Sequence, residues 1–108
     1  NVNVIEGNKT QASAYLDSSC KTPLTNIDWG NMTFGEKKMI YFFLKNTGNT
    51  TINSIKVEVI SDVQSIGGYI DSTPLFPDEV RKYSASLKIK LAGIALGKHN
   101  VGTYISVS

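Results

Sequence analysis

A strict alternation of side chains from position 83 to position 91 constrains this chain more than any other feature. Apolar or small residues occupy the odd positions and polar residues the even ones, in the order Tyr83-Ser84-Ala85-Ser86-Leu87-Lys88-Ile89-Lys90-Leu91. A period of two is that of a β-strand with one face buried and the other in water. A helix would need a period near 3.6, so this stretch predicts a strand.

The same pattern recurs along the rest of the chain. Residues 55–59 and 101–107 alternate clearly, while 1–5, 12–16 and 27–29 are shorter candidates for strands. No stretch has a convincing helical period. Seven or eight mainly antiparallel strands of this kind predict an all-β chain that folds as a β-sandwich.

Turn-forming residues separate these segments. Asp17-Ser18-Ser19, the region from Pro74 to Pro77 and the segment from Gly93 to Gly97 are typical of turns and loops. The pair Gly67-Gly68 also lies in a stretch that we expect to be broken rather than extended. No repeat or low-complexity tract divides the chain, so we expect one domain over residues 1–108.

The most apolar segment is the run from Met39 to Leu44, in which every residue is apolar or aromatic. Alternation would place large side chains on both faces of this strand. We therefore expect a central strand with one face in the core, where Phe43 is buried, and the other face covered. Residues 45–49 (Lys-Asn-Thr-Gly-Asn) then end the strand in a turn.

Composition excludes several classes of protein. The net charge is +2, and Arg81 is the only arginine, so the residue best suited to bidentate phosphate recognition is nearly absent. We expect no nucleic-acid partner. The single Cys20 rules out an intrachain disulfide, and no apolar run approaches the roughly 18 residues of a membrane span.

Residues 27–36 (Ile-Asp-Trp-Gly-Asn-Met-Thr-Phe-Gly-Glu), followed by the apolar strand and the Asn-Thr-Gly-Asn turn, resemble a recurring signature of immunoglobulin-like domains. Abnormal-spindle and major-sperm-protein-like modules are similar, as are archaeal extracellular filament and envelope β-sandwich proteins. The last strand, 102–107, is similar to that of the same group. The resemblance covers about half of the chain and implies an immunoglobulin-like sandwich with an interaction or structural role. The Cys…Trp…Cys pattern of antibody domains is absent.

The polar residues form no pattern typical of catalysis or metal binding. His99 is the only histidine, and nothing near it in sequence supplies a second ligand or a nucleophile. Asp62, Asp71, Asp78 and Glu79 could hold a hard cation, but their spacing matches no calcium loop and is typical of solvated carboxylates. We expect no catalytic residue, no metal site, no cofactor and no enzymatic activity.

Three Asn-x-Ser/Thr motifs, at Asn8, Asn31 and Asn49, are candidate N-glycosylation sites in expected turns or loops. Nine Asn and 20 Ser or Thr in 108 residues would produce about two such motifs by chance. The slight excess, with a surface rich in Thr and Asn, favours an extracellular or cell-surface glycoprotein.

Four aromatic residues could stack on sugars, namely Trp29, Tyr15, Tyr69 and Tyr104. Their scatter over separate segments is more typical of core and edge packing. A carbohydrate-binding module is therefore one alternative function, and it would need these rings in an exposed row.

The leading hypothesis is a structural or assembly subunit of an extracellular or cell-surface filament, acting through protein-protein interaction. Val2, Val4 and Ile5 precede Gly7, so residues 1–6 could be lent to the sheet of another copy, as in β-augmentation. An ordinary first strand in its own sheet is the alternative. We expect the partner to be a protein, with copies of the same chain among the candidates. The second hypothesis is an envelope-anchored immunoglobulin-like binding module, such as a stator domain of a motility machine.

Overall fold

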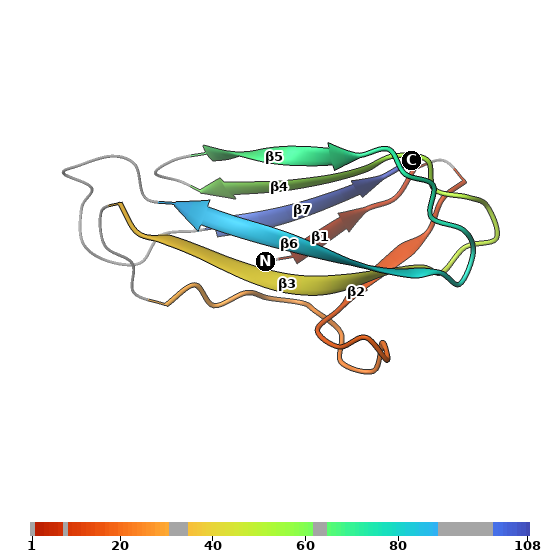
Figure 1. Cartoon of the computed structure of the whole chain (residues 1–108), viewed down its shortest axis with the longest axis horizontal. Helices are drawn as coiled ribbons and strands as arrows, with labels where there is room; N and C mark the ends of the chain where they lie inside the picture. The colour runs from red at the N-terminus through yellow and green to blue at the C-terminus, as the bar shows by residue number, and fades with distance from the viewer. Residues whose placement is uncertain (1, 8, 31–34, 62–64, 89–100) are drawn as a thin grey trace.

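The computed structural model describes residues 2–7, 9–30, 35–61, 65–88 and 101–108. They form two sheets that pack face to face, with the strands running along the length of the molecule (Figure 1). The four-stranded sheet has the order β1-β7-β4-β5 and the three-stranded sheet the order β2-β3-β6. The described strands are β1 (Val2–Ile5), β2 (Ala12–Tyr15), β3 (Lys37–Asn46), β4 (Ile55–Ser61), β5 (Ser65–Asp71), β6 (Val80–Lys88) and β7 (Val101–Val107).

The β-sandwich predicted from the sequence is confirmed. The β1–β7 ladder is parallel, and the other described ladders are antiparallel. The core between the two sheets takes the alternate residues that the period of two selects. These buried residues include Ile55, Val57 and Val59 of β4, Tyr83, Ala85 and Leu87 of β6, and Thr103, Ile105 and Val107 of β7.

Strand β3 is central in its sheet, as expected, because it pairs with β2 on one side and β6 on the other. The expectation that Phe43 is buried is wrong. Phe42 and Leu44 point into the core with no exposed surface, so Phe43, between them, faces outward and is half-buried. The outer face of β3, which we expected to be covered, is open to solvent: Met39 and Tyr41 are 45% and 56% exposed.

The region around Gly67 and Gly68 is a strand, which corrects the expectation of a broken segment. Val57 pairs with Tyr69 and Val59 pairs with Ile66, so β5 carries one more residue than β4 between these pairs. This is a β-bulge. A Cβ on Gly68 would overlap the carbonyl oxygen of Val57, which explains why glycine stands here.

Residues 27–29 form no strand, although a brief one was expected. Trp29 is nevertheless buried, and its carbonyl accepts a hydrogen bond from Lys38 Nζ at 2.8 Å. The second strand ends at Tyr15, so Leu16 leaves the buried face and is 52% exposed. His99, the residues expected to extend β6 beyond Lys88 and the expected turn at 93–97 lie outside the described residues.

The turn after β3 is held by the side chain of Asn46. Its amide nitrogen donates to the carbonyls of Thr50 and Leu75, at 2.8 and 2.9 Å, and its oxygen accepts from the Gly48 N–H. Asn46 is fully buried, so these bonds give its amide nitrogen and oxygen the partners that burial would otherwise deny them. The expected turn at 45–49 thus also anchors the loop that follows β5.

Candidate functional site

The proposed assembly strand lies at the outer edge of the four-stranded sheet. In β1, Val2 and Val4 are half-buried and pack against the core, while Ile5 is 50% exposed. Their register partners on β7 are Thr103, Ile105 and Ser106, respectively. The structure therefore places this strand along the last strand of its own chain (Figure 1).

A second segment joins β1 to the other sheet. The Val2 N–H donates to the Thr25 carbonyl at 3.1 Å, and the Leu24 N–H donates to the Ala14 carbonyl of β2 at 3.0 Å. The side chain of Leu24 is buried. This edge of the sandwich is thus closed by β1 together with residues 22–25.

Of the three glycosylation motifs, Asn49 is the one whose asparagine is described, and it is exposed in the turn after β3. Asn8 and Asn31 lie outside the described residues. In the motif of Asn8, the Thr10 hydroxyl is buried, where it accepts from the Gly7 N–H at 2.9 Å and donates to the Val107 carbonyl at 3.3 Å.

The four aromatic residues considered for sugar stacking do not share one surface. Trp29 is buried, Tyr15 lies on the outer face of β2, Tyr69 is on β5, and Tyr104 is on β7 beside Gly102. They come from both sheets, so no row of exposed rings forms among them.

A different aromatic surface lies on the outer face of the three-stranded sheet. We call it the lysine–tyrosine face. Its centre is formed by outward-facing Tyr15, Met39, Tyr41 and Phe43, and its surroundings by Lys37, Lys45, Lys82 and Lys88. Tyr15 lies opposite Phe43 in the β2–β3 ladder, so these two rings are cross-strand neighbours.

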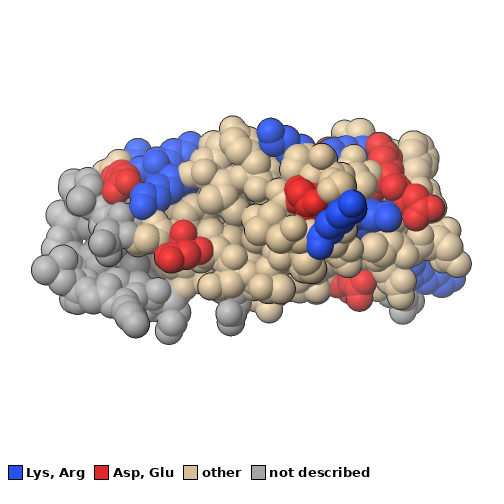
Figure 2. Space-filling model, turned by 90° about the horizontal axis from the view of Figure 1, so that it is seen from below, with Lys and Arg blue, Asp and Glu red and all other residues tan. Residues whose placement is uncertain are grey.

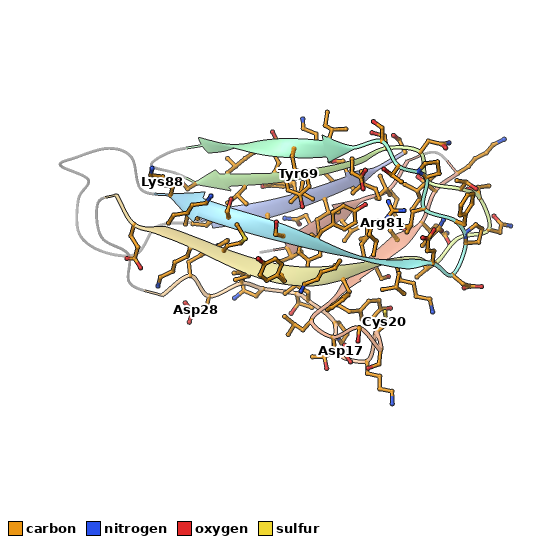
Figure 3. The ribbon with its side chains drawn as sticks, viewed as in Figure 1. Asp17, Cys20, Asp28, Tyr69, Arg81 and Lys88 are labelled. Carbon is orange, nitrogen blue, oxygen red and sulfur yellow. The ribbon has the colours of Figure 1, made fainter. Side chains whose placement is uncertain are left out.

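The lysines of this face sit at defined register positions. Lys82 is opposite Phe43, and its Nζ lies 4.4 Å from the centroid of the Tyr41 ring, a cation–π contact. Lys37 is directly opposite Lys88 at the other end of β6. Figure 3 shows Lys88 and Arg81 at opposite ends of that strand.

Charge is divided unevenly between the two sheets. The strands β2, β3 and β6 carry five lysines and Arg81, which is six of the 11 cationic residues of the chain, and none of its nine acidic residues. The four-stranded sheet carries Lys56, Glu58 and Asp71. On the side shown in Figure 2, acidic and basic groups are interspersed with broad uncharged areas.

A shallow depression lies beside this face along β6. It has a volume of about 380 Å³ and is lined by Tyr41, Tyr69, Lys82, Tyr83 and Ser84. Tyr69 reaches it from β5 (Figure 3). The depression therefore joins the lysine–tyrosine face to the open edge between β5 and β6.

A polar cluster fixes the loop between β5 and β6. Tyr83 Oη donates to Asp71 Oδ2 at 2.7 Å, and Arg81 Nη1 donates to the same oxygen at 3.1 Å. Arg81 also donates to the carbonyls of Thr73 and Pro74, at 2.9 and 2.8 Å. These bonds all stay within the loop and the strands that flank it, so the arrangement is structural.

The pKa values of Asp71 and Tyr83 in this cluster are shifted in opposite directions. The hydrogen bond from Tyr83, the Thr73 N–H and the charge of Arg81 lower the pKa of Asp71 to about 2. Burial, followed by the hydrogen bond to Asp71, raises the pKa of Tyr83 to about 12. At neutral pH the two groups are a carboxylate and a neutral phenol.

The remaining candidates are dispersed. Cys20 is a free, half-buried thiol in the loop after β2, where Asp17 accepts hydrogen bonds from the N–H groups of Lys21 and Thr22 (Figure 3). Among the described residues, no group of three His, Cys, Asp or Glu side chains is placed to hold a metal ion. Over the same residues, no helix has the length and apolarity to cross a membrane.

The lysine–tyrosine face was missed in the sequence, although its signal was present. Met39, Tyr41 and Phe43 are alternate residues of one apolar run. Lys88 is one of the even, polar positions of the 83–91 pattern, and Lys82 shares its parity one residue before that pattern begins. The ladder register that brings them together could not be read from the sequence.

The sequence matches no protein-family model, and neither a curated protein nor a solved structure matches it.

Proposed function

We propose that this domain is an immunoglobulin-like structural subunit that assembles with copies of itself outside the cell or at the cell surface. It acts by protein-protein interaction and has no catalytic role. The proposed mode of assembly is exchange of β1, which would leave its own sheet and pair with β7 of a neighbouring copy.

The position of β1 at the sheet edge carries this proposal. It is four residues long, precedes Gly7 and completes the sheet by pairing with the last strand. A neighbour's β1 could make the same ladder to β7 and bury the same Val2 and Val4 side chains. Exchange of an identical element costs little, because the exchanged strand makes in the neighbour the interactions that it makes in its own chain.

A cysteine pair tests whether the strand is exchanged. Asn3 and Tyr104 are register partners, so Asn3→Cys and Tyr104→Cys in a Cys20→Ser background place two thiols across the β1–β7 ladder. Exchange should produce covalent dimers and longer ladders on a non-reducing gel after oxidation at high protein concentration. A product that stays monomeric at every concentration would overturn strand exchange. The single variant Asn3→Cys is the control for random cross-linking.

Deletion of residues 1–6 gives an independent readout. If β1 is exchanged between copies, the truncated chain should no longer form ordered polymers in negative-stain microscopy. It should also expose the edge of β7 that β1 normally covers. A synthetic peptide of residues 1–6 should then bind in trans and restore solubility. If the intact chain is monomeric and the peptide does not bind, the filament hypothesis fails.

The exposed position of Asn49 supports the extracellular part of the proposal. A glycan on this turn would extend into solvent without displacing a buried group. Mass spectrometry of the native protein should find Asn49 modified if the chain is exported through a glycosylating pathway. An unmodified Asn49 in native material would remove this support.

A second function is a binding module anchored in the cell envelope, which does not polymerise. The lysine–tyrosine face favours it, because exposed Met39 and Tyr41 form an apolar centre outside the core. Size-exclusion chromatography separates the two functions. A filament subunit forms long polymers, whereas the binding module stays monomeric until its partner is added.

A further inference from the structure

Two lysines of the outer face, Lys37 and Lys88, are placed unfavourably for the stability of their sheet. Lys37 and Lys88 are directly opposite each other, and like charges in this position repel. Neither has an ion pair within the described residues. Of the undescribed segments, 31–34 and 89–100 contain no Asp or Glu, and 62–64 contains Asp62. An acidic ligand bound at this end of the face would relieve the repulsion.

The apolar centre of the same face is largely exposed to solvent. Tyr41 is 56% exposed and Met39 is 45% exposed, beside the half-buried Phe43. Aromatic residues and Met are enriched in the cores of protein interfaces, which are surrounded by a polar, solvated rim. The lysine–tyrosine face has this anatomy, with a rim of one charge sign.

We propose that the lysine–tyrosine face binds an extended acidic segment of a partner protein. Charge complementarity selects the acidic partner, because the face carries the four lysines Lys37, Lys45, Lys82 and Lys88, and the strands β2, β3 and β6 contain no acidic residue. Lys82 and Lys88 are six residues apart on one side of β6, or about 20 Å. An extended segment of about seven residues spans this distance, with carboxylates over the lysines and apolar side chains over Met39 and Tyr41.

The segment binds to the face and does not extend the sheet. Strand addition to β6 would need the outward N–H and C=O of Ser84, but the Tyr69 hydroxyl already bonds both. The depression lined by Tyr41, Tyr69 and Lys82 instead accepts one side chain of the segment. This site is separate from β1, so its test is independent of strand exchange.

The probe is a synthetic seven-residue peptide with Glu at both ends, Tyr at the third and fifth positions and Ser at the others, so that the Glu and Tyr side chains all face the sheet when the peptide is extended. It is titrated into the isotopically labelled full chain. Amide shifts in NMR spectra should cluster on β3 and β6, and binding should weaken as salt is added. Lys82→Glu with Lys88→Glu should weaken binding by about tenfold or more. If the double variant folds poorly, Lys45→Glu replaces it, and this single variant should also weaken binding.

The matched control is Lys9→Glu with Lys21→Glu, which changes the net charge equally at exposed positions outside the face. It should weaken binding by less than about twofold, since only long-range charge is altered. An equal loss in both double variants, shifts centred on β4 and β7, or no binding at millimolar peptide would each overturn the proposal. Tighter binding of polygalacturonate to the same amides would assign the face to an acidic polysaccharide instead.

Discussion

The Tyr69 hydroxyl bonds both backbone polar groups of Ser84 on the open edge of β6. It donates to the Ser84 carbonyl at 2.7 Å and accepts from the Ser84 N–H at 3.1 Å. An edge strand presents unpaired groups that invite pairing with other chains. Here a side chain from β5 in the opposite sheet occupies these groups, so one residue both links the two sheets and protects the edge.

Tyr69→Phe should therefore destabilise the domain by about 1–2 kcal/mol, the net value of two ordinary hydrogen bonds. The ring remains, and with it the stacking on Tyr83, whose centroid is 6.4 Å away. Urea unfolding measures the loss, and faster hydrogen exchange at the Ser84 amide should accompany it. Tyr104→Phe is the control, since its hydroxyl has no hydrogen bond among the described residues. Equal losses in both variants would contradict this role for Tyr69.

Asp71 makes stability depend on pH in the acid range. Its pKa in the folded state is about 2, below the ordinary 3.8, so the unfolded chain binds the proton first as the pH falls. The stabilisation is present above pH 3.8 and is lost as the pH falls towards 2. Asp71→Asn should flatten the unfolding free energy in this window, as measured by urea unfolding at several pH values. An NMR titration that places the Asp71 midpoint at its ordinary value would rule this out.

Tyr83 makes stability depend on pH in the alkaline range, and here stability falls as the pH rises. Its pKa is raised from 10 to about 12, so the unfolded chain releases this proton before the folded chain does. Stability from this group is present below pH 10 and is lost as the pH rises through 12. Near-ultraviolet titration should show one of the five tyrosines ionising late. Tyr83→Phe should remove that late step, and a variant that retains it would show that another tyrosine is responsible.

The strand pattern could be predicted from the sequence, but the parity of the most apolar run could not. Where Ile55 and Lys56 alternate, the buried face is obvious. Between Met39 and Leu44 both parities are apolar, so the sequence does not say whether Phe42 or Phe43 is buried. The inward direction is set by the ladder to β6, where Phe42 pairs with the buried Tyr83.

The pairing of the strands cannot be read from the sequence, and for this reason the candidate site was predicted only in part. Local alternation is enough to predict the N-terminal strand, whereas Gly68 suggests a break because a glycine pair normally weakens a strand. The lysine–tyrosine face depends on β2, β3 and β6 lying side by side in a fixed register. Such non-local information is not contained in any single segment.

Replacement of the two neighbouring phenylalanines tests the corrected parity. Phe42→Ala should cost about 3–5 kcal/mol, because Phe42 has no exposed surface and its removal leaves a cavity. Phe43→Ala should cost about 1 kcal/mol, since the half-buried ring packs only on the outer face. Urea unfolding followed by the fluorescence of the buried Trp29 measures both. A larger loss for Phe43→Ala would reverse the assigned faces of β3.

The last prediction concerns the bulge at Gly68. Gly68→Ala should destabilise the domain by about 2–3 kcal/mol or more, because the new Cβ would overlap the Val57 carbonyl oxygen and force β5 away from β4. Hydrogen exchange along β5 should rise, since its pairing is disturbed at this point. Gly35→Ala is the control: Gly35 has a positive φ of 82° but no atom within 4 Å of its Cβ position, so only backbone strain of about 1 kcal/mol is expected. If Gly68→Ala costs no more than Gly35→Ala, the close approach of β4 and β5 at the bulge is wrong, and so is the placement of Tyr69 that depends on it.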